Sequence, residues 1–100
     1  MTDNQSEPVD AESLRAEIEE IDQQLMLLLG LRFRCTDQLS ERLVSEGVQK
    51  DPGDGEDRVE FMERLALDTG VSPVLAIGLM KAVAQAVAEN HQRIKASRSH

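Results

Sequence analysis

Residues 11–47 carry an apolar stripe at helical spacing that includes arginines. The stripe positions follow one another at steps of four and three residues without a slip: Leu14, Ile18, Ile21, Leu25, Leu28, Arg32, Cys35, Leu39 and Arg42. A charge that leaves water costs several kcal/mol unless an opposite charge pairs with it. The stripe therefore predicts an anion beside this helix, either a carboxylate of the protein or a bound ligand.

The length of this segment constrains what one chain can cover. It contains no proline and predicts a single helix of about 35 residues, roughly 50 Å long. A compact domain of 100 residues has a radius of gyration of only about 13 Å. One chain cannot cover such a stripe, so we expect the helix to pack along another chain.

Composition excludes several classes of function. The net charge of −8 argues against general nucleic-acid binding, and two Phe with no Trp or Tyr argue against base stacking. The single cysteine, Cys35, excludes an internal disulfide and a cysteine-based metal site, and we expect it to be buried in the stripe. No apolar run approaches the roughly 18 residues of a membrane span, and the polar, acidic start is unlike a signal peptide. We expect a cytoplasmic protein with no metal and no cofactor.

The rest of the chain predicts an all-α fold of three helices, one of them very long. Residues 1–10 are expected to be a disordered acidic tail, followed by a single helical domain over residues 11–97. Asp10 or Ser13 is expected to cap the first helix. A loop dense in turn residues follows at 47–55, then a second helix over about 56–69 that stops at Gly70. Ser72 is expected to cap a third helix with Pro73 at its first position.

The third helix is apolar on most sides until His91, so it is expected to be buried on several faces. No nucleophilic triad, glycine-rich phosphate loop or metal-ligand spacing is found in the sequence. The remaining candidates for a functional site are cationic side chains directed at helix interfaces. Such a set can bind a small dianion through guanidinium groups in a dry pocket. This set is Arg15, Arg32, Arg42, Arg58 and His91.

Structural interpretations of Arg15, Arg42 and His91 remain open. Arg15 could pair with Glu19 on its own helix, and Arg42 could reach solvent near the helix end. His91, at the polar end of the third helix, would by itself be a surface residue. Arg32 has apolar surroundings for two turns in each direction, which favours a functional role.

At these residues and their neighbours, the chain resembles the all-helical chorismate mutases of the AroQ class. The resemblance covers residues 13–92 and lies in LRAEI (14–18), IDQQL (21–25), LLL (27–29), Arg32 and FMERL (61–65). It implies an intertwined homodimer whose long first helices pair across a two-fold axis. It also implies two equivalent sites that bind chorismate, a small dianion, and convert it to prephenate without a cofactor.

The resemblance implies roles for individual residues. Arg15, supplied by the partner subunit, and Arg32 match arginines that grip the substrate carboxylates. The family has a basic residue at the position of Leu43, and we expect Arg42 to replace it. The acidic loop position falls on Asp54. The residues expected for substrate binding or catalysis are thus Arg15, Arg32, Arg42, Asp54, Asp57, Arg58, Val87 and His91.

Four of these residues depart from the family pattern. Asp57 and Arg58 stand where the family has an arginine followed by a glutamate. Val87 stands at a common serine, and His91 at a common glutamine. We expect His91 and Arg42 to face the ether oxygen, and Asp54 or Asp57 to accept a hydrogen bond from the ring hydroxyl. Two alternatives remain: a mutase or lyase for amino-deoxychorismate or isochorismate, and a non-catalytic helical dimer. The resemblance also implies that a partner enzyme can be needed for activity.

Overall fold

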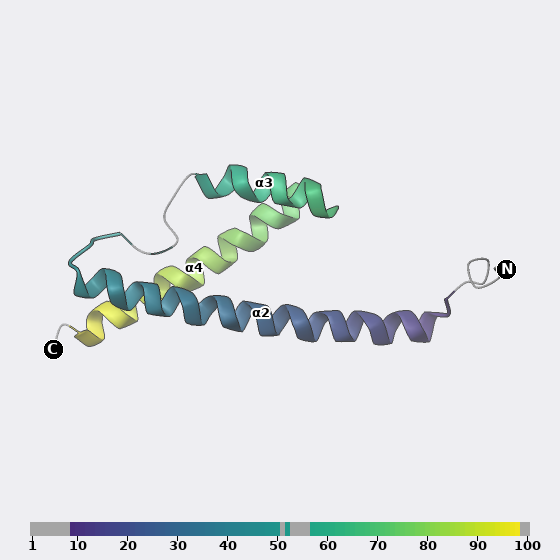
Figure 1. The fold of residues 1–100 in the computed structure, drawn as a ribbon, viewed down its shortest axis with the longest axis horizontal. Helices are drawn as coiled ribbons and strands as arrows, with labels where there is room; N and C mark the ends of the chain where they lie inside the picture. Colours follow the sequence, from purple (N-terminus) through teal and green to yellow (C-terminus); the bar gives the residue numbers. More distant parts are fainter. Residues whose placement is uncertain (1–8, 51, 53–56, 99–100) are drawn as a thin grey trace. The chain divides into compact units, whose positions relative to one another are not determined.

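The computed structural model describes residues 9–50, 52 and 57–98, and its elements are helices (Figure 1). They are α2 (Ala11–Ser45), α3 (Asp57–Thr69) and α4 (Pro73–Arg98). The described residues form no strand, so the predicted all-α class with three helices, one of them 35 residues long, is confirmed. Residues 1–8 of the predicted tail and the predicted site residue Asp54 lie outside the described residues.

Side chains at the helix starts explain where α2 and α4 begin. The backbone N–H of Ser13 donates to Oδ1 of Asp10 at 2.8 Å, so Asp10, not Ser13, caps α2. This hydrogen bond lowers the pKa of Asp10 from its usual 3.8. The N–H of Leu75 donates to Oγ of Ser72 at 3.4 Å, which confirms Ser72 as the cap of α4.

Glycines follow the ends of α2 and α3. Gly47 and Gly70 both have a φ of 77°, in the left-handed region that side chains with a Cβ disfavour. After α3, the N–H of Val71 donates to the carbonyl of Ala66 at 2.9 Å and closes the last turn. The predicted stop at Gly70 is confirmed.

The chain divides into two compact units, one ending at Arg32 and the other beginning at Phe33. Helix α2 contributes to both, and each unit is described by itself. The prediction that residues 11–97 make one domain stays a prediction. In the described part of the chain, no helix combines the length and the apolar character that crossing a membrane requires.

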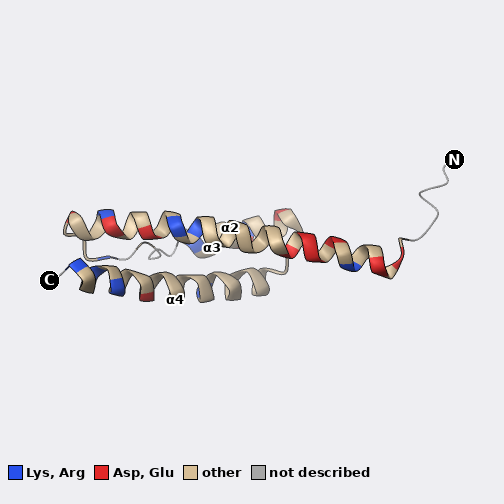
Figure 2. Cartoon of the chain, turned by 90° about the horizontal axis from the view of Figure 1, so that it is seen from below, with Lys and Arg blue, Asp and Glu red and all other residues tan. Residues whose placement is uncertain are grey.

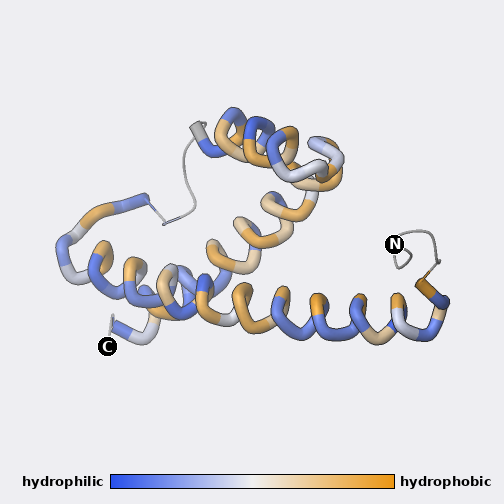
Figure 3. The backbone as a smooth tube through the Cα atoms, turned by 45° about the vertical axis from the view of Figure 1, so that its right-hand side comes forward, coloured by the Kyte–Doolittle hydropathy of each residue, from blue (hydrophilic) through white to orange (hydrophobic). Residues whose placement is uncertain are grey.

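The first unit leaves its apolar stripe uncovered. The five aliphatic side chains of the stripe in this unit are 46–63 % exposed, and they are Leu14, Ile18, Ile21, Leu25 and Leu28. Hydrophobic positions recur among hydrophilic ones along this part of α2 in Figure 3. Nothing within this unit covers the stripe, and the expectation that another chain covers it stays a prediction.

The second unit holds the buried residues of the protein. Helix α3 packs against α4, and the last turns of α2 form hydrogen bonds with the C-terminal half of α4. The buried residues of α4 lie at steps of seven, four and four along one stripe, and they are Ala76, Val83, Val87 and His91.

Two burial predictions are wrong for the single chain. Helix α4 is buried on one stripe only, and Val74 is 81 % exposed and Leu75 64 %. Cys35, expected to be buried, is exposed. Both errors have the same cause: the sequence marks apolar faces, but the other elements of one chain are too few to cover all of them.

Candidate functional site

The last turns of α2 have two different sides. One side faces α4 and carries Asp37 and the buried Ser40, whereas Cys35, Leu39 and Arg42 lie exposed on the stripe. Arg42 is two residues from Ser40, which places it about 200° around the helix, on the other side. Leu43, one residue further, is half-buried.

Polar side chains join α2 to α4 within the second unit. Nδ2 of Asn90 donates to Oδ1 of Asp37 at 3.1 Å, and Nδ1 of His91 lies 3.0 Å from Oγ of Ser40. An exposed ion pair, with 3.8 Å between Nη1 of Arg98 and Oε1 of Glu41, extends the series to the end of α4. Asp37, Ser40 and Asn90 were not predicted as site residues. Their only signal in the sequence is a small polar side chain in the interior of a helix.

His91 is buried, with 2 % of its surface exposed, and Ser40 is 1 % exposed. The interpretation of His91 as a surface residue is therefore wrong, because α4 places it against the side of α2 that carries Ser40. Its Nε2 has no hydrogen-bond partner among the described residues. A buried imidazole with one nitrogen held keeps the capacity for one further hydrogen bond at the other nitrogen.

Val87 lies one turn before His91 and is also 2 % exposed. Met80, Ala84, Val87 and His91 follow at steps of four, three and four, so they share one face of α4. The structure thus brings two predicted site residues, Val87 and His91, onto one face of this helix. Val87 offers an apolar wall and no hydrogen-bonding group.

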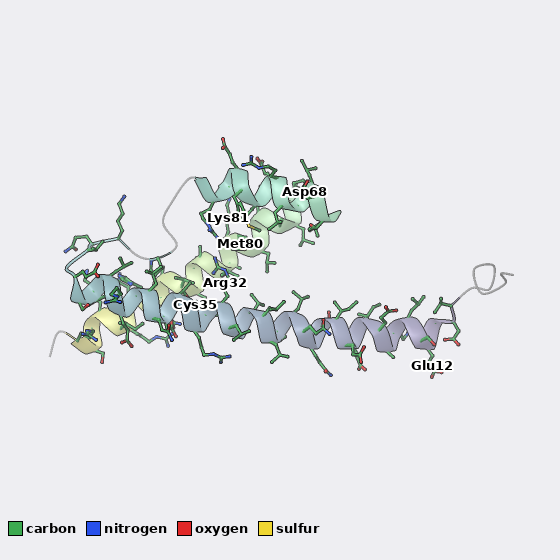
Figure 4. The ribbon with its side chains drawn as sticks, in the orientation of Figure 1. Glu12, Arg32, Cys35, Asp68, Met80 and Lys81 are labelled. Carbon is green, nitrogen blue, oxygen red and sulfur yellow. The ribbon has the colours of Figure 1, made fainter. Side chains whose placement is uncertain are left out.

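A pocket of about 140 Å³ lies between α3 and α4. Its apolar lining comes from Val59, Met62, Ile77, Met80 and Ala84, and two cations, Arg58 and Lys81, also line it. Figure 4 shows Met80 and Lys81 on the part of α4 beside α3. The predicted site residue Arg58 therefore lines a pocket, and so does Lys81, an exposed residue that the sequence favours as a surface charge.

The arginines of the α2 stripe have no carboxylate partner among the described residues. Arg15 and Arg42 are exposed and Arg32 is half-buried. Acidic side chains outnumber basic ones in the first part of α2, as Figure 2 shows, yet none forms an ion pair with Arg15. The structure therefore does not support the alternative that Arg15 pairs with Glu19.

The remaining predicted residues are placed only in part. Asp57 is the first residue of α3, one residue before Arg58, and Asp54 lies outside the described residues. Within one chain the structure does not bring Arg42 and His91 together, because Arg42 lies on the uncovered side of α2. Among residues 9–50, 52 and 57–98, no group of three His, Cys, Asp or Glu side chains is arranged to hold a metal ion.

Comparisons with known protein families, with curated proteins and with solved structures each found no match to this chain.

Proposed function

We propose that this protein is a homodimeric enzyme of the all-helical chorismate mutase type, which converts chorismate to prephenate. The observation that carries the proposal is the stripe of α2, whose exposed aliphatic side chains share the helix with Arg15, Arg32 and Arg42, which have no carboxylate partner in the described chain. The aliphatic groups require a covering surface, and the guanidinium groups require an anion.

A second copy of the chain fits the uncovered stripe. Within the first unit the stripe runs from Leu14 to Arg32, and its middle lies near Gln23. An antiparallel pairing about a two-fold axis at that point places Arg15 of the partner subunit beside Arg32. Each dimer then has two equivalent places where a guanidinium group of one chain lies beside one of the other chain. Such a pair can bind the two carboxylates of one ligand.

The chemistry of the reaction suits such a site. The rearrangement breaks the ether carbon–oxygen bond and forms a carbon–carbon bond within the same molecule, so no nucleophile, proton transfer or metal takes part. The protein holds the folded conformer and stabilises the negative charge that grows on the ether oxygen. In the proposal, Arg15 of the partner subunit and Arg32 hold the carboxylates.

The ether oxygen is assigned to His91, whose Nε2 is unpartnered among the described residues. Arg42 was expected to share this role, and it stays in the proposal as a cation of the uncovered face. Asp54 or Asp57 is assigned to the ring hydroxyl, as the resemblance implies; Asp57 begins α3, and Asp54 lies outside the described residues.

The test is the disappearance of chorismate, followed by ultraviolet absorbance, with the purified full-length protein. Arg32→Ala removes a guanidinium–carboxylate contact of about 2–5 kcal/mol, so kcat/KM should fall by at least about 30-fold. Arg34→Ala is the matched control, since Arg34 is exposed and outside the stripe. A wild-type protein that neither turns over nor binds chorismate would contradict the proposal.

A related substrate is the second candidate. Leu43 and Val87 offer no polar group at two positions where the resemblance implies substrate contacts, and Val87 is buried in the second unit. Because these two contacts differ from those that the resemblance implies, the substrate can carry a different ring substituent, as amino-deoxychorismate and isochorismate do. Parallel assays of the three compounds separate these activities. A non-catalytic dimer would turn over none of these compounds and would give no heat on titration with a bicyclic transition-state mimic.

A further inference from the structure

Two cations from different helices line the pocket between α3 and α4. Arg58 comes from the first turn of α3, and Lys81 comes from the middle of α4. Neither side chain has a carboxylate partner among the described residues. Like charges that line one small pocket repel each other, and an anion between them turns that repulsion into attraction.

Contacts within the fold hold Arg58 at this place. Its guanidinium carbon lies 5.6 Å from the centroid of the Phe61 ring, a cation–π contact with the next turn of α3. Arg58 also lies at the start of α3, where the positive end of the helix dipole is found. An anion at Arg58 is therefore favoured by the helix as well as by the guanidinium.

The lining of the pocket defines the rest of the ligand. Apart from the two cations it is aliphatic and thioether surface, contributed by Val59, Met62, Ile77, Met80 and Ala84. Sites of this kind bind an apolar body and orient it through a few polar contacts. The chemical class that fits is a carboxylate with an apolar body.

We propose that Lys81 is a substrate-binding residue, which grips one carboxylate of the dianionic substrate together with Arg58. The identity of that substrate rests on the proposed function. Lys81 adds a cation from α4, while α2 offers the uncharged Leu43 where the resemblance implies a basic residue. Lys81 and His91 are ten residues apart on α4, about 15 Å along the helix, so the two residues contact different parts of the site.

Methionine methyl groups report on this pocket directly. Met62 and Met80 line it, whereas Met26 is a 66 % exposed residue of α2 and serves as an internal reference. The full-length protein, labelled with ¹³C at its methionine methyl groups, is titrated with chorismate and followed by NMR. We expect saturable shifts of the Met62 and Met80 signals and no comparable shift of Met26.

Lys81→Gln keeps much of the side-chain length and removes the charge. A charge-assisted hydrogen bond is lost, so the Kd for chorismate should rise by about tenfold or more. Arg58→Gln should act in the same direction. The matched controls are Lys50→Gln and Arg64→Gln, because both residues are exposed and neither lines the pocket.

Failure of this inference differs from failure of the proposed function. Wild-type binding with an unchanged Kd in Lys81→Gln overturns the role of Lys81 and leaves the enzyme proposal standing. Absence of chorismate binding and turnover in the wild type overturns both. Shifts of Met62 and Met80 that weaken in Lys81→Gln, but not in the two control variants, support the assignment of Lys81.

Discussion

The two parts of α2 differ in what they contact, although one helical pattern runs through both. From Ala11 to Leu28 every residue is exposed, and the apolar side chains have no cover from their own chain. From Phe33 to Ser45 the helix has one side against α4, with Ser40 buried there, and one side that remains open. The open side of the second part continues the stripe of the first.

This difference separates polar contacts that lie within the second unit from an apolar face that nothing in the first unit covers. The polar contacts of Asp37 and Ser40 with α4 are internal and independent of any partner. By contrast, no carboxylate of the described chain pairs with Arg15 or Arg32 on the first part of α2. In proteins, most of the stability of a helix comes from the packing of its apolar face. Covering the stripe therefore couples the folding of the first part to association.

The largest effect is expected from a charge placed in the stripe. Leu25→Glu puts a carboxylate on the uncovered face, where the proposed partner would bury it unpaired. The wild type should sediment near 22 kDa, twice the 11.1 kDa of the chain, and the variant as a monomer with a weaker helical signal at 222 nm. Analytical ultracentrifugation and circular dichroism measure the two effects.

Gln23→Glu is the matched control, because the same carboxylate then lies about 200° around the helix from Leu25. It should leave the mass and the helical signal unchanged. A wild type that is monomeric and fully helical would show that the first part of α2 needs no cover.

The next effect concerns the covered side of the helix. His91→Ala removes a buried ring and leaves the Ser40 hydroxyl without its partner, at an expected cost of about 2–3 kcal/mol. Ser40→Ala removes the hydroxyl alone and should cost about 1–2 kcal/mol. Urea unfolding at one fixed protein concentration gives both values.

The exposed Gln92, next to His91 on α4, provides the control for these variants. Gln92→Ala should change the free energy of unfolding by less than about 0.5 kcal/mol. Equal effects of Gln92→Ala and His91→Ala would mean that the buried pair does not stabilise the contact of α2 with α4.

Two glycines of the same helical segment should respond to alanine with opposite signs. Gly47 has a φ of 77°, so Gly47→Ala should cost about 1–2 kcal/mol. Gly30 lies inside α2 with open space around its Cβ position, so Gly30→Ala should add up to about 1 kcal/mol of stability. Thermal unfolding distinguishes them, and a loss of stability in Gly30→Ala would indicate that something covers this position.

The smallest effect belongs to the first turn of α2. Hydrogen bonding from the Ser13 N–H lowers the pKa of Asp10, so its stabilising contribution is present above the unfolded pKa. That contribution is lost as the pH falls through the lower folded pKa. Asp10→Asn keeps a capping side chain that does not titrate, so the helical signal of this variant should fall less than that of the wild type between about pH 5 and pH 3.

Local chemistry made much of the fold predictable from the sequence. Ser72 with Pro73 and Gly70 act within one turn of the chain, and the structure places each of them as expected. The stripe of α2 was also predictable, because periodicity is a property of one segment. The second helix begins at Asp57, one residue later than expected.

Contacts between distant segments were not predictable in the same way. The burial of His91 depends on Ser40, which lies 51 residues earlier in the chain. Lys81 lines a pocket only because α3 packs beside it. Cys35 and Leu75 are exposed although both belong to apolar faces. Helical periodicity therefore predicts an apolar face but not the element that buries it. The roles proposed for Arg15, Arg32 and Arg42 stay predictions.

The paired side chains across α2 and α4 determine how these helices are aligned along their length. Sliding α4 by one turn would move its residues about 5.4 Å and leave Ser40 and His91 without their hydrogen bond. The alignment is therefore encoded in the helices themselves and not in the number of residues that connect them. Engineered chains with a longer or shorter segment between Gly47 and Asp57 should consequently keep the same helix register.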